Sequence, residues 1–416
     1  MNKDADAPQT RGTEVDADWY LERKTPPFGL LCTVNVENRE VERLTDDSLN
    51  VQSFEWSPDG KRLAVAASED TRWASYIRTD LFVLDRETSK VRTLIKQEGR
   101  DDMPVWSPDG KQIAFRSQKG REDWTYYTWL ALVPASGGSP TYLTDKFQNG
   151  TGGSPRELFW TNDGKEIYFT CFHRMSHQLF RVSADKEDVV KVTPDDSQWY
   201  SQFSYSRATK TLAFTVENIT QPTDICFSTL SLSGIKKLTD LNPQLREIAH
   251  AQVKTISWKS TDDKWDIHGV LVKPPNYRPG KRYPLLLLLY GGPSMVSMEY
   301  GLHRQFPVEV LAAEGYLVLA PNTRGRGGYG YAFAHAIGNE KSYGIKPLED
   351  ALAGVDELIR REVVDPSRLG IMGHSYGGYL TALAITQTDK FKAASVSEAF
   401  AGQSRSRKLR REFLEV

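Results

Sequence analysis

A tryptophan-centred motif that recurs along the first half of the chain constrains its fold more than any other feature. Trp56-Ser-Pro-Asp-Gly-Lys61 returns as Trp106-Ser-Pro-Asp-Gly-Lys111, as Trp160-Thr-Asn-Asp-Gly-Lys165 and, degraded, as Tyr205-Ser-Arg-Ala-Thr-Lys210. The copies are 50, 54 and 45 residues apart. A second marker, an aliphatic residue that closes each unit, keeps nearly the same period at Leu44, Leu94, Leu143, Val192 and Leu238. Two independent markers with one period indicate a structural repeat.

Each repeat unit predicts four short strands. Proline and glycine in the motif have the backbone preferences of a tight turn, and a β-rich run follows the turn in every copy, as at residues 63–66. Two more strands complete the unit, as at 81–84 and 91–94. Four strands in a unit of about 50 residues are typical of a β-propeller blade. Four units and a half unit at residues 30–45 predict an incomplete all-β propeller of about four and a half blades.

Near residue 245 strands begin to alternate with helices, after two β-rich segments at 253–258 and 267–272. The apolar run 285–290 suits a parallel strand buried on both faces. An amphipathic helix starts near Pro347 and has Leu348, Leu352, Val355 and Ile359 on one face. The other predicted elements are helices at 308–313 and 378–386 and strands at 317–320, 369–372 and 393–396. This order predicts an α/β domain with a parallel sheet covered by helices on both faces.

Gly373-His374-Ser375-Tyr376-Gly377 matches the G-x-S-x-G nucleophile elbow. It follows a predicted buried strand and opens a predicted helix, so Ser375 would lie on a tight turn with its hydroxyl exposed. The backbone N–H of Tyr376 would donate to a developing oxyanion, and Tyr290 ends the apolar strand where a second donor is needed. The alternatives are an ordinary glycine-rich turn at Ser375 and a packing role for Tyr290.

Together these motifs resemble the prolyl oligopeptidase family of serine peptidases, in which a β-propeller precedes and caps an α/β-hydrolase domain. Besides the tryptophan repeats, the matching strings are Tyr290-Gly-Gly-Pro293, Asn322-Thr-Arg-Gly-Arg-Gly-Gly-Tyr-Gly330, Glu349-Asp-Ala-Leu-Ala-Gly-Val-Asp356, Gly373-His-Ser-Tyr-Gly-Gly-Tyr379 and Thr386-Gln-Thr-Asp-Lys-Phe391. The resemblance implies Ser375 as the nucleophile, with the Tyr290 hydroxyl and the Tyr376 amide as the oxyanion hole.

Within the family, the hydrolase-domain strings are most similar to the acylaminoacyl-peptidase branch, although that branch commonly has histidine at the position of Tyr290. The dipeptidyl-peptidase branch clamps the substrate amino terminus with a Glu-Glu pair on the propeller, and no Glu-Glu doublet occurs in this sequence. The residue preferred at the cleaved bond and the choice between exopeptidase and endopeptidase activity stay open.

One departure from the family concerns the catalytic triad, which in α/β-hydrolases runs along the chain as Ser, then Asp or Glu, then His. All seven histidines precede Ser375, at positions 173, 177, 250, 268, 303, 335 and 374. The triad Asp and His are therefore absent, and the match of motifs stops near Val396. We expect a chain truncated at both ends that is catalytically inactive as it stands.

Other motifs have weaker functional interpretations. Gly325, Gly327 and Gly330 form a G-x-G-x-x-G, but the acid that dinucleotide binding needs at the end of the next strand is missing, which favours a flexible loop near the active site. His173 and His177 lack the glutamate of a zincin between them and are expected on the surface of a propeller hairpin. The His374 ring is expected to point away from the Ser375 hydroxyl. The basic tail 404–411 could bind RNA, but a solvated end is favoured.

Composition excludes several classes of partner. Fifty-three Lys and Arg against 54 Asp and Glu give a net charge of −1, so no global field recruits nucleic acid or an anionic membrane. Cys32, Cys171 and Cys226 contain no CxxC pair, which argues against a disulfide framework or a thiolate zinc site and fits the reducing cytoplasm. The apolar run 285–290 is far shorter than the roughly 20 residues that span a bilayer. A cytoplasmic protein is expected unless an upstream signal peptide has been lost.

The resulting hypothesis divides the chain into a polar segment at 1–27, β-propeller repeats at 28–243 and an incomplete α/β-hydrolase domain at 248–416. It assigns hydrolysis of short peptides through an acyl-serine intermediate, with no metal and no organic cofactor. The alternative is a non-catalytic propeller that binds proteins, or a pseudoenzyme. The oligomeric state stays open.

Overall fold

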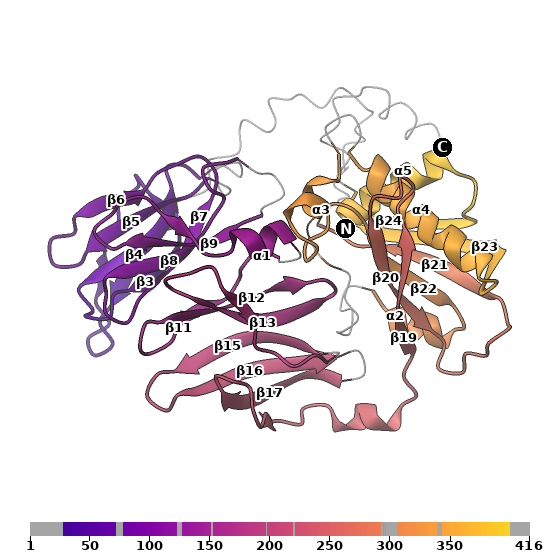
Figure 1. The fold of residues 1–416 in the computed structure, drawn as a ribbon, viewed down its shortest axis with the longest axis horizontal. Coiled ribbons are helices and arrows are strands. Elements are labelled where there is room, and N and C mark those ends of the chain that lie inside the picture. Colours follow the sequence, from indigo (N-terminus) through magenta and orange to yellow (C-terminus); the bar gives the residue numbers. More distant parts are fainter. Residues whose placement is uncertain are drawn as a thin grey trace, which may run out of the picture.

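The computed structural model describes residues 28–71, 78–122, 127–150, 153–196, 198–218, 221–292, 294, 296, 306–338 and 343–399 (Figure 1). The predicted polar segment 1–27 and the basic tail 404–411 lie outside this range. In Figure 1 the repeat sheets run from the left of the molecule to its lower side, and the elements after residue 250 occupy the right. Among the described residues, no helix combines the length and apolar character that a bilayer crossing requires.

Each repeat unit forms one four-stranded antiparallel sheet whose strands pair in chain order. The strands of the four sheets are β3 (Asn50–Trp56), β4 (Arg62–Ser68), β5 (Asp80–Asp85) and β6 (Val91–Ile95); β7 (Asp101–Trp106), β8 (Gln112–Ser117), β9 (Trp129–Pro134) and β10 (Thr141–Tyr142); β11 (Leu158–Trp160), β12 (Glu166–His173), β13 (Ser176–Ser183) and β14 (Val189–Lys191); and β15 (Trp199–Ser206), β16 (Thr211–Asn218), β17 (Gln221–Thr229) and β18 (Lys236–Lys237). The half unit pairs β1 (Cys32–Val34) with β2 (Val41–Arg43), and the short helix α1 (Asp145–Gly150) follows the second sheet. The predicted four blades and half blade are confirmed.

The Ser-Pro-Asp-Gly sequence forms a hydrogen-bonded turn that we call the Ser-x-Asp turn. In the first blade the Ser57 hydroxyl donates to Asp59 Oδ1 at 2.5 Å and accepts from the N–H of Arg62 at 2.9 Å. Gly60 has φ of +69°, a conformation that glycine adopts without strain. Because the serine hydroxyl stabilises the ionised carboxylate, the pKa of Asp59 lies below its usual value. This local chemistry explains why the motif recurs between the first two strands of each blade.

In the second and third blades the tryptophan of the motif joins the blade to the one before it. The indole N–H of Trp106 donates to the carbonyl of Glu55 at 3.2 Å, and that of Trp160 donates to the carbonyl of Val105 at 3.1 Å. Both rings are buried, whereas Trp56, which follows only the half blade, is 39% exposed. The repeat therefore encodes contacts between blades as well as the blades themselves.

The second half of the chain forms one six-stranded sheet, entered through the short 3-10 helix Pro243–Glu247. Its strands, in spatial order, are β19 (Gln252–Lys259), β20 (Asp266–Lys273), β22 (Leu317–Asn322), β21 (Tyr283–Leu289), β23 (Val364–His374) and β24 (Ala393–Ser397). The last four are parallel, as the sequence predicts, whereas β20 is antiparallel to both of its neighbours.

Helices cover both faces of this sheet. They are α2 (Val308–Ala313), α3 (Tyr331–His335), α4 (Ile345–Arg360) and α5 (Tyr376–Gln387). Along β21, Leu285 and Leu287 pack with residues of α4 and α5, while Leu288 packs on the opposite face with residues of α2. The continuous apolar run is thus explained by burial on two sides.

A propeller hairpin contacts the second half of the molecule. At the turn between β12 and β13, the N–H of Arg174 donates to the carbonyl of Gly328 at 2.6 Å. Phe172 and Met175 beside this turn are buried in one cluster with Val296 and Phe306. The propeller therefore packs directly on the loop that follows β22.

The prediction that His177 lies on the hairpin surface is wrong. Its side chain is buried, its ring stacks on Trp199 at 4.7 Å, and its Nδ1 lies 2.6 Å from the carbonyl oxygen of Tyr200. Burial lowers the pKa of His177 to about 4. The position is buried because the fourth blade covers this hairpin, a contact between segments that local sequence does not indicate.

We expect Trp160→Phe to lower the free energy of unfolding by about 2 kcal/mol, because the buried carbonyl of Val105 loses its donor. Trp56→Phe is the matched control at the same motif position, and its side chain is partly exposed. It should change stability by no more than about 0.5 kcal/mol. Urea denaturation of both variants measures the difference, and equal losses would argue against the joining role of the tryptophan.

Candidate active site

Ser375 lies between strand β23 and helix α5, on a backbone conformation that serine rarely adopts. Its φ is +55° and its ψ is −120°, a strained combination for a residue other than glycine. Neighbouring elements hold it there, since its N–H donates to the carbonyl of Ser397 at 2.9 Å and its carbonyl accepts from the N–H of Tyr379 at 3.0 Å. Ser375 itself is half-buried at this turn.

Two glycines make this turn possible. A β-carbon on Gly373 would lie 2.2 Å from the carbonyl oxygen of Gly377, and one on Gly377 would lie 1.8 Å from the carbonyl oxygen of Leu289. Both distances are far below van der Waals contact, so α5 can start this close to β21 only with glycine at these positions. The G-x-S-x-G pattern is therefore a packing requirement of the strand-turn-helix unit.

Tyr290 comes next to Ser375 because β21 and β23 are paired parallel strands that end together. Leu289 pairs with Gly373, so the residues that follow the two strands are neighbours. A β-carbon on Gly291 would lie 3.3 Å from the Ser375 β-carbon, which shows how closely the two segments approach. The Tyr290 ring packs edge-on against Phe306 at 5.6 Å, and burial raises the pKa of its phenol well above the usual value.

Tyr376 is the first residue of α5, so its backbone N–H precedes the hydrogen bonds of the helix. Its side chain is buried among Tyr343 and Tyr379, with ring centroids 5.3 and 6.0 Å away. The structure thus brings the three predicted site residues, Ser375, Tyr290 and Tyr376, to one end of the parallel strands.

No described histidine is hydrogen-bonded to Ser375. The His374 ring turns toward β24, where its Nδ1 lies 3.2 Å from Ser397 Oγ and its Nε2 lies 3.4 Å from a carboxylate oxygen of Glu398. His250 contacts Glu309, and His335 packs on Tyr331. His303 lies outside the described residues.

The loop between β22 and α3 is buried, so the expectation of a flexible loop is wrong. Arg324 and Arg326 are 3% and 1% exposed. Gly325, at φ of +96°, packs against Ile337, and Gly327 packs against the backbone carbonyl of Ser294. The glycines of the G-x-G-x-x-G pattern permit close contact with protein atoms, which explains them without a dinucleotide.

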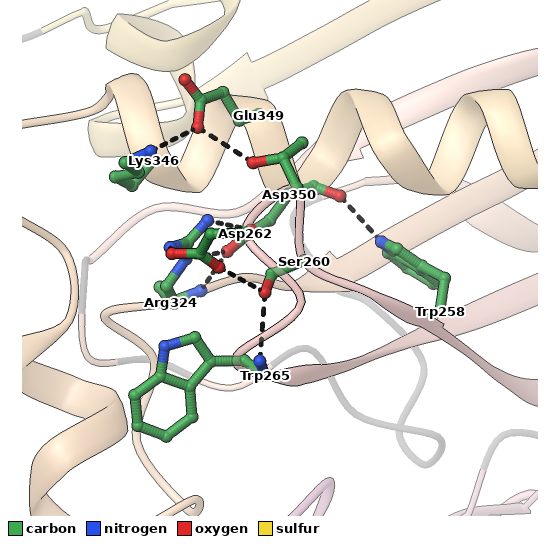
Figure 2. A network of polar contacts seen from close by, with 9 residues as sticks. Trp258, Ser260, Asp262, Trp265, Arg324, Lys346, Glu349 and Asp350 are labelled. Atoms are coloured by element: carbon green, nitrogen blue, oxygen red, sulfur yellow. Dashed lines mark hydrogen bonds and ion pairs between the residues drawn. The ribbon is translucent and has the colours of Figure 1, made fainter.

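Arg324 anchors this loop to two distant elements (Figure 2). Its guanidinium donates to both carboxylate oxygens of Asp350 on α4, at 2.8 and 2.6 Å, and to Asp262 at 2.9 Å. Asp350 is itself buried, and its backbone carbonyl accepts from the indole of Trp258 at 2.8 Å. The network therefore ties α4 and the β19–β20 hairpin to the start of the loop.

Asp262 belongs to another Ser-x-Asp turn, between β19 and β20. The Ser260 hydroxyl donates to Asp262 Oδ1 at 2.7 Å and accepts from the N–H of Trp265 at 3.1 Å, as in the propeller blades. Here the second carboxylate oxygen is taken by Arg324. The serine hydroxyl and then the arginine lower the pKa of Asp262 to about 2.

Arg326, two residues after Arg324, is a second buried arginine, and its role was not predicted from the sequence. It donates to the carbonyl oxygens of Tyr290, Gly291 and Gly292, which follow β21 directly. The sequence feature that could have indicated this role is the presence of charged residues in a glycine-rich segment after a buried strand. Among the described residues, no group of three or more His, Cys, Asp or Glu side chains is arranged to hold a metal.

We expect Gly377→Ala to destabilise the protein by about 3 kcal/mol or more, because the new methyl group would overlap the Leu289 carbonyl. Gly370→Ala on β23, the strand that leads into this turn, is the control. Its methyl group would meet only the end of the Leu286 side chain, which can move. Thermal or urea unfolding that shows equal losses would contradict the packing requirement.

Asp262→Asn should remove part of the acid sensitivity of folding. Because the folded-state pKa is about 2 and an unfolded aspartate titrates near 3.9, Asp262 contributes stability above pH 4 that is lost as the pH falls toward 2. Urea unfolding from pH 5 to pH 2.5 should therefore show a gap between wild type and variant that narrows on acidification. A gap that stays constant would mean that the carboxylate charge is not involved.

Comparison with known proteins agrees with this architecture. Residues 303–408 match the model of the prolyl oligopeptidase family, and residues 57–119 match that of the dipeptidyl peptidase IV N-terminal region. The first match extends past Val396, so the expectation that the resemblance stops there is wrong: similarity continues beyond the last recognisable motif.

Among curated proteins, dipeptidyl-peptidase 5 of Porphyromonas gingivalis is 25% identical over 352 residues, which are 84% of this chain and 50% of that protein. The uncharacterized peptidase YuxL of Bacillus subtilis is 32% identical over 245 residues, 58% of this chain and 36% of that protein. The chain spans about half the length of the dipeptidyl-peptidase 5 relatives that it matches.

Solved structures share the fold. A putative dipeptidyl aminopeptidase IV from Bacteroides ovatus superposes with a TM-score of 0.66 at 20% identity, over 88% of this chain and 55% of that one. The acylaminoacyl peptidase of Pyrococcus horikoshii superposes with a TM-score of 0.57 at 19% identity, over 89% of this chain and 66% of that one. With a propeller-like first half, an α/β second half and matches to family models in both halves, the chain has the architecture and the sequence signatures of the prolyl oligopeptidase family.

Proposed function

We propose that Ser375 is the nucleophile of a serine peptidase site, with the Tyr376 amide and the Tyr290 hydroxyl as oxyanion donors. The strained conformation of Ser375, held on both sides by hydrogen bonds, is the observation that supports this assignment most strongly. The paired ends of β21 and β23 support it further, because Leu289 pairs with Gly373 and so Tyr290 follows β21 at the same end of the sheet as Ser375 and the first residue of α5.

In the proposed reaction the Ser375 hydroxyl oxygen forms a bond to the scissile carbonyl carbon while its proton passes to a base. The carbonyl oxygen becomes an oxyanion that the two donors stabilise. The carbon–nitrogen bond then breaks, the amine leaves with a proton, and an acyl-serine ester remains. Water hydrolyses this ester and restores the serine. The chain's own residues supply the nucleophile and the oxyanion donors.

The base is the missing component in this sequence. No histidine follows Ser375, and the described histidines make contacts elsewhere. We propose that these 416 residues alone do not turn over peptides, because a serine without a base is a poor nucleophile at neutral pH.

For the substrate class we propose short peptides. The relatives are named dipeptidyl and acylaminoacyl peptidases, and their names support peptides as the substrates. In this chain the hairpin between β12 and β13 packs on the loop that follows β22. We expect this contact to limit how large a substrate can approach from the propeller side.

Imidazole supplied from solution tests the nucleophile and the missing base together. A fluorophosphonate should leave Ser375 unmodified without imidazole and should phosphonylate it slowly when imidazole is present. In that step the serine oxygen bonds to phosphorus, fluoride leaves, and imidazole takes the serine proton. Intact mass spectrometry and peptide mapping measure the adduct, and Ser375→Ala should show no adduct under either condition.

Each other outcome contradicts part of the proposal. Rapid labelling without imidazole would mean that an internal base serves Ser375. Equal labelling of Ser375→Ala would place the nucleophile elsewhere. Failure of the wild-type chain to react even with imidazole would contradict a preorganised serine site.

A further inference from the structure

Arg326 is one of the largest fully buried side chains among the described residues, and it donates hydrogen bonds to the segment after β21. Its Nη2 donates to the carbonyl of Tyr290 at 2.8 Å, and its Nη1 donates to the carbonyls of Gly291 at 3.0 Å and Gly292 at 2.6 Å. Three consecutive carbonyl groups therefore point at one guanidinium. Such charge-assisted hydrogen bonds are stronger and more directional than neutral ones.

These contacts fix where Tyr290 lies. Gly291 approaches the β-carbon of Ser375 closely, so movement of residues 290–292 would change the separation of the serine and the phenol. A carbonyl that turned toward the oxyanion position would also repel the developing negative charge. By binding all three carbonyl oxygens, Arg326 keeps their negative ends away from that position.

The charge of Arg326 has a second effect. Burial lowers its pKa to about 10, which leaves it protonated at neutral pH. Its guanidinium lies 6.0 Å from the Tyr376 ring centroid, and its charge opposes the rise that burial causes in the pKa of Tyr290. A more acidic phenol is a stronger hydrogen-bond donor, so the cation favours donation from Tyr290.

The position of Arg326 is itself fixed by the network of Figure 2. Arg324, two residues earlier, is held by Asp350 and Asp262, and Gly325 between the two arginines packs on Ile337. The loop cannot slide along the sheet without breaking these contacts. These contacts therefore fix the backbone from which the Arg326 side chain reaches residues 290–292.

We propose that Arg326 is a positioning residue for the oxyanion site: it holds residues 290–292 in place and strengthens Tyr290 as a donor. This inference rests on the proposed function of Tyr290 and Ser375. It assigns a role to a side chain that acts through Tyr290 and does not touch the substrate.

The test compares Arg326→Gln, which removes the charge, with Arg326→Lys, which keeps the charge and loses the planar fork. Arg116→Gln is the control for loss of a largely buried arginine, because the Arg116 side chain is 15% exposed and pairs with Asp102 in the propeller. Each variant carries 2,3,5-trifluorotyrosine at position 290, whose phenol is acidic enough to titrate by ¹⁹F NMR. The rate of imidazole-dependent phosphonylation of Ser375 is measured in parallel on the same chains without the fluorinated residue.

We expect Arg326→Gln to raise the titration midpoint of the phenol and to slow phosphonylation on the order of 10-fold or more. Arg326→Lys should keep the midpoint near that of wild type and recover part of the rate. Arg116→Gln should change neither quantity, although it lowers stability. A merely structural role for Arg326 would lower stability without moving the midpoint.

If a folded Arg326→Gln variant keeps the wild-type titration midpoint of the phenol, the electrostatic role of Arg326 is overturned. If it keeps the wild-type phosphonylation rate, the positioning role is overturned, while the proposed function of Ser375 stays intact. If Arg326→Gln does not fold, Arg326→Lys is decisive. A lysine variant with the wild-type phosphonylation rate and an unchanged ¹⁹F chemical shift would show that the planar guanidinium is not needed to position residues 290–292. A wild-type chain that fails to react contradicts the proposed function instead, and the phenol titration still decides the effect of Arg326 on Tyr290.

Discussion

Two guanidinium groups buried two residues apart hold in place the end of the sheet at which Ser375 lies. Burying an arginine carries a large desolvation cost, so each must be compensated by well-placed acceptors. Arg324 is compensated by two carboxylates, and Arg326 by three backbone carbonyls. The loop that carries them is thereby fixed to α4, to the β19–β20 hairpin and to the segment after β21. Removal of either side chain would leave buried acceptors without a donor, which is costlier than the loss of a surface contact.

The Ser-x-Asp turn has two different roles along the chain. In the propeller blades the Ser-x-Asp turn closes a hairpin, and its aspartate is largely solvated. Between β19 and β20 the turn has the same hydrogen bonds, but Asp262 offers its second oxygen to Arg324. A turn that forms from local sequence thus presents a preformed anion to a buried cation elsewhere in the fold. This arrangement lowers the entropy cost of the ion pair, since the carboxylate is already ordered.

The sequence predicts those parts of the structure that depend on local spacing. The tryptophan period locates four blades, and the strand-turn-helix pattern around Ser375 locates the elbow, because both follow from backbone preferences within a few residues. It does not predict the burial of His177 or the roles of Arg324 and Arg326. Those depend on contacts between segments far apart in the chain, as when Arg326 reaches residues 290–292. A glycine-rich pattern is also ambiguous, since glycine serves flexibility and close packing alike.

The central claim is that Ser375 faces an oxyanion site made by Tyr376 and Tyr290. A crystal structure of the chain with Ser375 phosphonylated tests it most directly, because the phosphoryl oxygen marks where the oxyanion would form. The account predicts this oxygen at roughly 2.7–3.1 Å from both the Tyr376 amide nitrogen and the Tyr290 hydroxyl oxygen. A phosphoryl oxygen that points to solvent, or that is bound by other donors, would contradict it.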